Sequence, residues 1–301
     1  DDDLSRGLGD VYKRQQYLAA KTIDEAVNAH EKANGTARFL AGGTDLLVQI
    51  KSGIRKPNLV IDIKKIVELN SINENSDGEF EIGASVSGAN LNRNSKFAKL
   101  WPGVLEAFRL IGSEQIQGRA SLGGNLCNGS PAGDSVPALI AAGCKAVIAG
   151  PKGRKDVPIE NFHLGPGKTV LENGEMLVSL KFPKRVSNSA DAYLRMTPRT
   201  EMDIAVVGCG VNISLENDIC THARVSLGAV APTPLLIEEA SDIMIGSKLD
   251  DDTLDSVSKI CMDACNPIND KRGTVDYRTK VAGVLAKRAT KLAAERIGGN
   301  K

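Results

Sequence analysis

The spacing of hydrophobic residues near the start of the chain predicts alternating strands and helices. Thr22 precedes apolar residues spaced three and four positions apart, and Glu25 follows Thr22 by three positions, as in a capping box. This pattern predicts a helix over residues 23–33. Apolar segments at 38–41 and 59–63 flank a Gly-Gly pair and another apolar stretch, which predicts strand, turn, helix and strand. We therefore expect an α/β unit with its glycine turn at the carboxyl end of a strand.

The middle of the chain shows shorter apolar segments around a second glycine-rich stretch, residues 119–134. The predicted strands are 80–86, 145–149 and 176–182. The predicted helices are 89–97, 102–111 and 136–143.

The composition changes after Pro183, where the polar residues 184–189 predict a linker or a mobile loop. We place the main domain boundary there. Beyond it, residues 204–214 and 221–230 predict two antiparallel strands joined by a turn. The remaining apolar residues recur at helical spacing, and the predicted helices, packed on one face of a small sheet, are 235–245, 254–265 and 277–297.

Length and charge limit the number of domains and the kinds of partner that we expect. A chain of 301 residues is long enough for about two domains. The 38 Lys and Arg nearly balance the 37 Asp and Glu. The chain therefore has no overall positive electrostatic field that would favour binding to nucleic acid or anionic lipid. No apolar run reaches the roughly 18 residues that a membrane span needs. We expect a globular protein with no nucleic-acid partner and no membrane span.

The cysteines predict neither a metal site nor a disulfide framework. Their spacing contains no CxxC pair. Cys261 and Cys265 stand one helical turn apart and are expected to be small buried apolar residues. The absence of a cysteine framework and of a signal sequence predicts a cytoplasmic location.

Residues 1–15 are expected to be a non-native or disordered extension. They show neither helical periodicity nor strand alternation, and the wording SRGLGDVYKRQ resembles translated adaptor sequence. The native start is then expected near Gln16 or Tyr17.

Two glycine pairs are the strongest candidates for chemistry. Residues 41–45 (AGGTD) and 121–125 (SLGGN) each place a Gly pair beside a hydroxyl residue. Converging backbone N–H groups in such turns form an anion-binding nest, and Gly permits both close approach and positive φ. Two turns together could hold both phosphates of a dinucleotide. For a single pair, the alternative is a tight turn only.

The other motifs that would indicate catalysis are absent. Neither turn matches GxGxxG, and the chain contains no Walker loop, no HExxH and no GxSxG. His30, His163 and His222 have no evident carboxylate or Cys partner and are expected to be surface or hydrogen-bonded histidines. Glu238 and Glu239 are adjacent on a predicted helix and are expected to face solvent. We predict no catalytic side chain and no metal ligand.

Three segments in order carry a family resemblance. They are AGGTDLLVQIKSG (41–53), GSEQIQGRASLGGNLCNGSPAGDSVPAL (112–139) and YLRMTPRTEMDIAVVG (193–208). With them the chain resembles the FAD-binding medium subunits of molybdenum hydroxylases, which include xanthine, nicotinate and carbon monoxide dehydrogenases. The similarity extends from about residue 16 to residue 296.

The resemblance implies an α+β fold. It predicts a PCMH-type FAD-binding domain over 16–185, made of α/β subdomains at about 16–66 and 67–185. A smaller α+β domain with an antiparallel sheet and helices is then expected over 186–301.

The resemblance also implies a binding site whose backbone amides wrap the FAD pyrophosphate. The residues implied in this role are Leu40, Ala41, Gly42, Gly43, Thr44, Asp45, Leu46, Ser121, Leu122, Gly123, Gly124 and Asn125.

Five further residues match family positions. Asp134 is expected to accept hydrogen bonds from FAD hydroxyls; its alternative role is the N-cap of a helix over 135–143. Arg195 is expected near the flavin, where a cation favours the anionic reduced ring, and Asp203 is expected to orient it. The alternative is a plain surface ion pair between Arg195 and Asp203. Val170 and Leu171 are expected to line the flavin pocket.

The chain departs from the family pattern in one informative place. Gln117 and Gly118 stand where Arg and Asn are common, which puts in doubt a charged contact near the flavin or a partner subunit. Residues 53–112 contain no cysteine. The chain therefore lacks the iron–sulfur insertion of the related benzoyl-CoA reductase branch.

The implied function is electron transfer. A molybdenum-cofactor subunit would oxidise substrate, an iron–sulfur subunit would pass electrons singly, and FAD on this chain would deliver them to NAD+ or another acceptor. Two alternatives stay open, namely a self-contained FAD oxidoreductase and a non-catalytic assembly subunit. Substrate, acceptor and stoichiometry are not encoded in recognisable residues.

Overall fold

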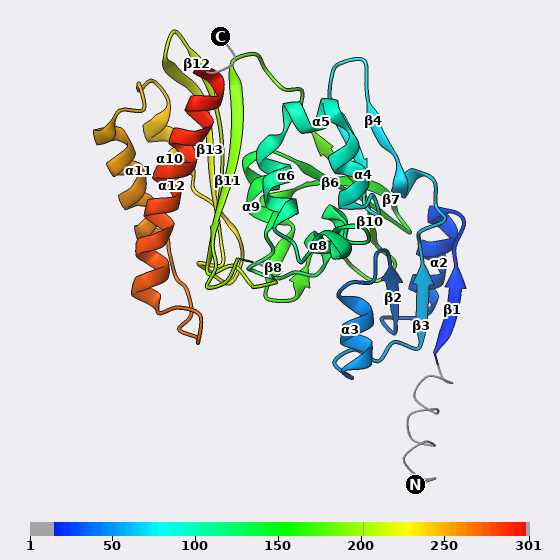
Figure 1. Cartoon of the computed structure of the whole chain (residues 1–301). Coiled ribbons are helices and arrows are strands. Elements are labelled where there is room, and N and C mark those ends of the chain that lie inside the picture. Colours follow the sequence, from blue (N-terminus) through cyan, green and yellow to red (C-terminus); the bar gives the residue numbers. More distant parts are fainter. Residues whose placement is uncertain (1–14, 201, 299–301) are drawn as a thin grey trace.

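The computed structural model describes residues 15–200 and 202–298, arranged as three successive regions along the chain (Figure 1). The prediction of a non-native extension over 1–15 falls, except for Gln15, outside the described residues.

The first region is a small parallel sheet with two helices. The strands lie in the order β1-β3-β2, with β1 at Gln16–Ala19, β2 at Ala37–Leu40 and β3 at Leu59–Asp62. The helices are α2 (Ile23–Lys32) and α3 (Leu46–Lys51). Thr22 Oγ1 accepts from the backbone N–H of Glu25 at 3.1 Å, and the Glu25 carboxylate accepts from Lys21 N–H at 2.8 Å. The predicted helix and its capping pattern are confirmed.

The second region is built on a five-stranded antiparallel sheet in the order β4-β5-β10-β6-β7. Its strands are β4 (Ile72–Glu74), β5 (Phe80–Gly83), β6 (Lys145–Gly150), β7 (Gly153–Pro158) and β10 (Met176–Phe182). A hairpin of β8 (His163–Gly165) and β9 (Lys168–Thr169), with the short 3₁₀ helices η1 (Glu68–Asn70) and η2 (Ile159–Asn161), completes it. The predicted strand over 80–86 ends at Gly83, because Val86 N–H bonds to Gly83 O and closes a turn.

Six helices accompany this sheet. They are α4 (Gly88–Arg93), α5 (Ser95–Leu100), α6 (Pro102–Arg109), α7 (Glu114–Gln117), α8 (Leu122–Cys127) and α9 (Ser135–Ala141). The single helix predicted over 89–97 is wrong. Asn94 adopts an extended conformation, and its side chain accepts from Phe97 N–H at 2.9 Å, so it ends α4 and begins α5.

The third region is an antiparallel sheet in the order β11-β12-β13-β14. Its strands are β11 (Ser189–Met196), β12 (Val207–Glu216), β13 (Ile219–Gly228) and β14 (Leu235–Leu236), followed by α10 (Glu238–Met244), α11 (Asp251–Asp263) and α12 (Val275–Gly298). Asn217 and Asp218, both at positive φ, form the predicted hairpin turn between β12 and β13. The helix predicted over 235–245 begins only at Glu238, because residues 235–236 pair with β13.

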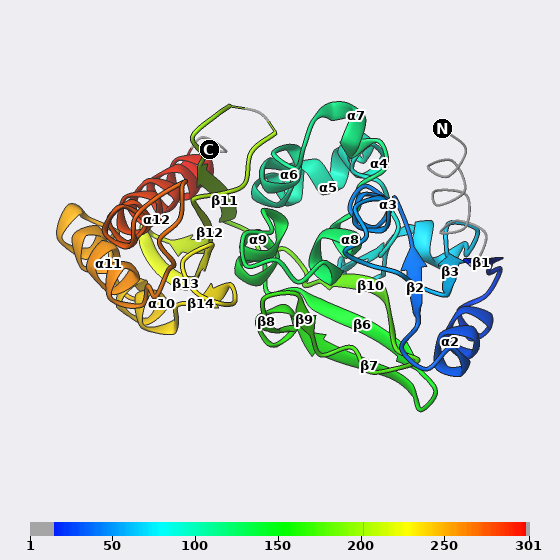
Figure 2. The same ribbon diagram turned by 90° about the horizontal axis from the view of Figure 1, so that it is seen from below.

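Helices cover both faces of the third sheet. The long helix α12 packs on β11 and β12 from one side, and α6 and α9 of the second region pack on β11, β12 and β13 from the other (Figures 1 and 2). The segment predicted as a linker, 184–189, therefore leads directly into a strand enclosed on both sides.

Candidate nucleotide-binding site

The first glycine turn joins β2 to α3. Gly43 has φ +78°, a left-handed conformation that favours glycine. A Cβ on the neighbouring Gly42 would lie 1.9 Å from the carbonyl oxygen of Arg119, and Arg119 Nε donates to Gly42 O at 3.4 Å. The turn thus rests directly on the backbone that leads into the second glycine turn.

The second glycine turn forms the start of α8. Ser121 is extended and its hydroxyl accepts from Gly124 N–H at 3.0 Å, as an N-cap does. A Cβ on Gly123 would lie 2.5 Å from Ala84 O, whereas one on Gly124 would meet only the Ser121 hydroxyl, at 3.1 Å. The first N–H groups of a helix have no partner within the helix, so this end offers donors to an anion.

The two turns lie side by side, as do the helices α3 and α8 that follow them (Figure 2). A hydrogen bond of 3.1 Å from Gln49 Nε2 to Asn128 Oδ1 joins the two helices. The structure therefore brings together the twelve predicted residues of the two turns.

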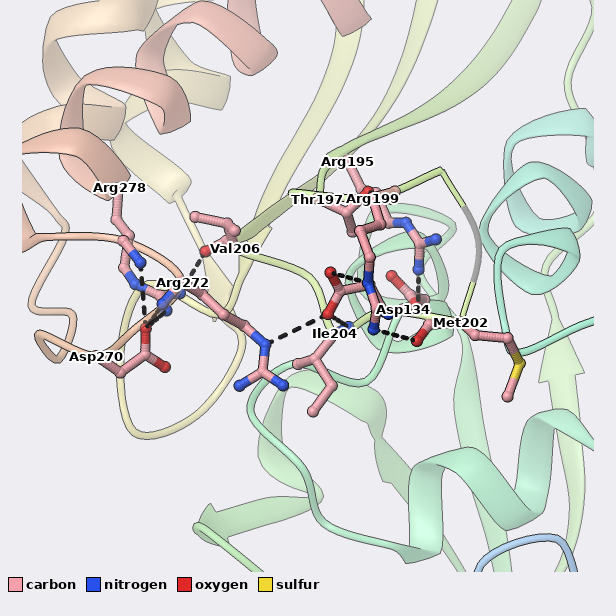
Figure 3. Close-up of polar contacts among 12 residues, drawn as sticks. Asp134, Arg195, Thr197, Arg199, Met202, Ile204, Val206, Asp270, Arg272 and Arg278 are labelled. Atoms are coloured by element: carbon pink, nitrogen blue, oxygen red, sulfur yellow. Dashed lines mark hydrogen bonds and ion pairs between the residues drawn. The ribbon is translucent and has the colours of Figure 1, made fainter.

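Asp134 stands between the second turn and the third region. It precedes α9 but makes no capping hydrogen bond with its side chain, so the alternative prediction of a helix N-cap is wrong. Its carboxylate instead accepts from Arg195 Nη1 at 2.7 Å (Figure 3). It also accepts from the Tyr193 hydroxyl at 3.1 Å. Asn125 Oδ1 accepts from the Ser135 hydroxyl at 2.7 Å, which connects the second turn to this group.

The Asp134–Arg195 pair is buried, and its charges compensate each other. The Arg195 side chain is 4% exposed. Burial raises the pKa of Asp134 to about 6, although Arg195 and the Tyr193 hydroxyl oppose the rise, so Asp134 is ionised at neutral pH. Burial and the neighbouring carboxylate raise the pKa of Tyr193, which keeps its hydroxyl a neutral donor.

Asp203 does not pair with Arg195. Its carboxylate accepts from Arg199 Nε and from Arg272 Nε, each at 3.4 Å (Figure 3). Both the predicted orienting role of Asp203 and the alternative surface ion pair with Arg195 are wrong. The strand β11 ends at Met196, and the following loop carries Asp203 toward the turn before α12, while the Arg195 side chain points toward α6 and α9.

Val170 and Leu171 lie beyond the β8–β9 hairpin. Both are half-buried and pack on the core of the second region. The hairpin contacts the far end of α8, where Gly167 N–H bonds to Gly129 O at 2.8 Å and His163 Nε2 bonds to Leu126 O at 2.8 Å.

Gln117 faces the protein interior. It is buried, and its Nε2 donates to Arg109 O at 2.7 Å and Ile111 O at 3.3 Å, at the end of α6. Gln117 thus supports the carboxyl end of α6 from inside the protein.

The remaining sequence candidates have ordinary surroundings. Glu238 and Glu239 are exposed, as predicted, and His30 accepts from Gly174 N–H at 3.0 Å. All six cysteines are free, and Cys261 is buried. Within 15–200 and 202–298, no group of three or more His, Cys, Asp or Glu could hold a metal ion. No helix in this same part of the chain is long and apolar enough to cross a membrane.

Sequence reasoning missed Tyr193 and Asp191, which lie on β11 beside Arg195. The signal was present, because residues 190–196 alternate strictly between apolar and polar side chains. Polar residues at such alternate positions ordinarily face solvent, whereas Asp191 and Tyr193 are buried.

Comparisons with known proteins identify related families and structures. The family described as "FAD binding domain in molybdopterin dehydrogenase" matches residues 12–185, and "CO dehydrogenase flavoprotein C-terminal domain" matches residues 192–293. The xanthine dehydrogenase FAD-binding subunit of Escherichia coli O157:H7 is 31% identical over 284 residues, which cover 94% of this chain and 97% of that protein.

Two further similarities concern carbon monoxide dehydrogenase. The medium chain of the Hydrogenophaga pseudoflava protein is 32% identical over 280 residues, 93% of this chain and 97% of that one. A solved structure of carbon monoxide dehydrogenase from Hydrogenophaga pseudoflava, which lacks the Mo-pyranopterin moiety of the molybdenum cofactor, matches with a TM-score of 0.90 and 32% identity, covering 94% of this chain and 98% of that chain.

Proposed function

Because this chain belongs to the family of FAD-binding medium subunits of xanthine and carbon monoxide dehydrogenases, we propose that it holds FAD across its two glycine turns and relays electrons. The electrons would come from an iron–sulfur subunit, itself supplied by a molybdenum-cofactor subunit, and would go to NAD+ or another acceptor. Relatives named as medium chains and FAD-binding subunits support this place in a larger complex.

The observation that carries the proposal is the direct contact between the two glycine turns. A diphosphate has two anionic groups, and each turn offers backbone amides where a Cβ is absent. Gly42 rests on Arg119 O, and Gly123 rests on Ala84 O, so neither turn could move away without breaking backbone contacts. The positive end of the α8 backbone further favours an anion there.

The Asp134–Arg195 pair would act toward the rest of the cofactor. Each Asp134 oxygen accepts one bond from the protein and keeps a lone pair free for a cofactor hydroxyl. Arg195 would stabilise negative charge on the reduced ring. Val170 and Leu171 would line the ring's pocket. FAD supplies the capacity to exchange one or two electrons, while the chain supplies binding and electrostatics.

The proposal also includes the domain boundaries and the cellular location. We place the FAD-binding domain at 16–185 and the C-terminal domain at 186–301, which the matched ranges 12–185 and 192–293 support. A cytoplasmic location is supported by six free cysteines, since thiols stay reduced in that compartment.

The first test is an absorption spectrum of the purified chain, followed by release and identification of the flavin. We expect roughly one FAD per chain. Gly43→Val and Gly124→Val should abolish FAD retention, with Gly298→Val as a control because a side chain there meets nothing within 4 Å. Normal flavin content in both turn variants would contradict the proposal.

A second test concerns the electron acceptor. The flavin is reduced without oxygen, mixed with NAD+, and its reoxidation followed by absorbance. Rapid reoxidation supports NAD+ as acceptor, and none points to a different one. Reduction of the isolated chain by a small substrate would instead favour a self-contained oxidoreductase.

A further inference from the structure

Both ends of helix α6 are capped by side chains of the strand β11. The residue at its N-cap position, Trp101, makes no capping hydrogen bond with its side chain. Instead, Asp191 of β11 accepts from the N–H of Val104, in the first turn, at 3.1 Å. At the opposite end, Arg195 of the same strand donates to the carbonyl of Leu110 at 2.9 Å.

The charges of Asp191 and Arg195 are favourable for the dipole of helix α6. A carboxylate at the amino end and a guanidinium at the carboxyl end both oppose the helix macrodipole. Asp191 and Arg195 are four residues apart and share one face of β11, so the strand spans the length of α6. A single strand thus clamps both ends of one helix.

The clamp is tight at the Asp191 end. A Cβ on Gly103 would lie 2.7 Å from Asp191 Oδ2 and 2.8 Å from Ala192 N, so the helix start is pressed against the strand. Asp191 is 3% exposed and also pairs with Arg185 at 3.3 Å. The Arg185 guanidinium stacks over the Trp101 ring, 4.3 Å from its centroid.

The middle of β11 is bound by side chains of α6 and α12. Tyr193 N–H donates to Glu106 Oε2 at 3.1 Å. Arg296, in the last turns of α12, pairs with Glu106 and donates to Asp191 O. The charged groups that face Asp191 from its neighbours are therefore Arg185, Arg296 and Glu106.

We propose that Asp191 is a positioning residue for the flavin environment. By accepting a hydrogen bond from the start of α6, Asp191 fixes the position of β11 relative to that helix. The position of β11 in turn determines where the Arg195 guanidinium contacts Asp134. The inference rests on the proposed function, because it assumes that the Asp134–Arg195 pair faces FAD. Asp191 itself is not required to touch the cofactor.

The test uses the full chain with bound FAD and the variants Asp191→Leu, Asp191→Asn and Arg195→Gln. The readouts are flavin content, the visible circular dichroism of the flavin and its reduction potential. Asp191→Leu should keep the FAD of the wild type, yet shift the dichroism and the potential in the direction that Arg195→Gln does. Asp191→Asn, which retains an acceptor oxygen, should give a smaller shift.

The double variant decides whether Asp191 acts through Arg195. If it does, Asp191→Leu/Arg195→Gln gives the same flavin signals as Arg195→Gln alone. Additive shifts would overturn the proposal, as would an Asp191→Leu protein with a lower melting temperature and wild-type flavin signals. Asp255→Asn, in an exposed pair with Lys287, serves as a control that should leave every signal unchanged.

Two further measurements cover the remaining outcomes. If Asp191→Leu fails to fold, Gly103→Ala disturbs the same contact without removing a charge and should shift the flavin signals likewise. In the cofactor-free chain, amide exchange over residues 193–196 should be faster in Asp191→Asn than in the wild type, and equal rates would overturn the clamp. A wild-type chain without FAD, or an Arg195→Gln protein with unchanged flavin, would contradict the proposed function instead.

Discussion

Gly42 lies so close to the carbonyl group of Arg119 that a Cβ at Gly42 would come within 1.9 Å of that oxygen. The obstructing atom is backbone, so no side-chain rotation could relieve the overlap. Glycine at position 42 therefore allows the two turns to touch, and any larger residue must push them apart.

We expect Gly42→Ala to lose FAD and to be less stable by about 1–3 kcal/mol, the usual effect of overpacking. Flavin content and urea unfolding measure the two effects. Gly118→Ala is the matched control in the same segment, because its Cβ would meet only Gln115 O, at 3.3 Å. Retention of FAD by Gly42→Ala would show that the contact between the turns is not needed for binding.

Arg195→Met should destabilise the protein by about 3 kcal/mol, because it leaves the Asp134 carboxylate buried without its cation. The pKa of Asp134 should rise above its present value of about 6, since Arg195 opposes the effect of burial. The double variant Arg195→Met/Asp134→Asn should recover part of the loss, because an amide carries no charge. Urea unfolding of the wild type, Arg195→Met, Asp134→Asn and the double variant measures these changes in stability. Purely additive losses would contradict the prediction.

Asp191 should make stability depend on pH. Burial raises its pKa from the ordinary 3.8 to about 6, despite the opposing effect of Arg185. The folded state therefore binds the proton more tightly, so this contribution to stability is complete below the unfolded pKa and is lost as pH rises through about 6. The wild type should lose about 1 kcal/mol relative to Asp191→Asn between about pH 5 and pH 7.5. Urea unfolding at both pH values measures the difference, and a constant difference would contradict the prediction.

Arg278 should be a major source of stability in the third region. It is 3% exposed, and its guanidinium donates to Val206 O at 2.6 Å and to Asp270 Oδ1 at 2.8 Å (Figure 3). It also donates to Ala229 O at 3.3 Å. Arg278→Met would leave the buried carbonyl of Val206 without this donor and would remove the ion pair with Asp270, so we expect a loss of about 2 kcal/mol.

The matched control for Arg278 is Arg272→Met. Arg272 is more exposed and pairs with Asp203 at a longer distance of 3.4 Å. Its replacement should change stability by about 1 kcal/mol or less. Thermal unfolding of both variants compares them, and equal losses would mean that the buried bonds of Arg278 add nothing.

Local patterns determined much of the fold. The helix after Thr22, the hairpin turn at Asn217 and Asp218 and the long final helix follow from capping residues, turn residues and helical spacing. The two glycine turns also stand out in sequence, because no other residue type combines close backbone approach with positive φ. The resemblance of three ordered segments then led to the family.

Partnerships between distant residues were decided only by the tertiary structure. Asp134 bonds to Arg195 and Tyr193 rather than capping its own helix, and Asp203 pairs with Arg272 rather than Arg195. Such pairs depend on which elements pack together, and no local pattern records that choice.

The strand β11 shows the physical reason most clearly. Its apolar residues Ala190, Ala192, Leu194 and Met196 pack on the core of the third region, which their alternation indicates by itself. Its polar face carries Asp191, Tyr193 and Arg195, which sequence alone would place in water. Because α6 and α9 cover that face, those groups are buried and must find partners within the protein, and the helix ends and Asp134 supply them. The alternation of β11 is present in the sequence, although no strand was predicted over residues 189–196, and the packing of the second region on the third decided that its polar residues became a clamp.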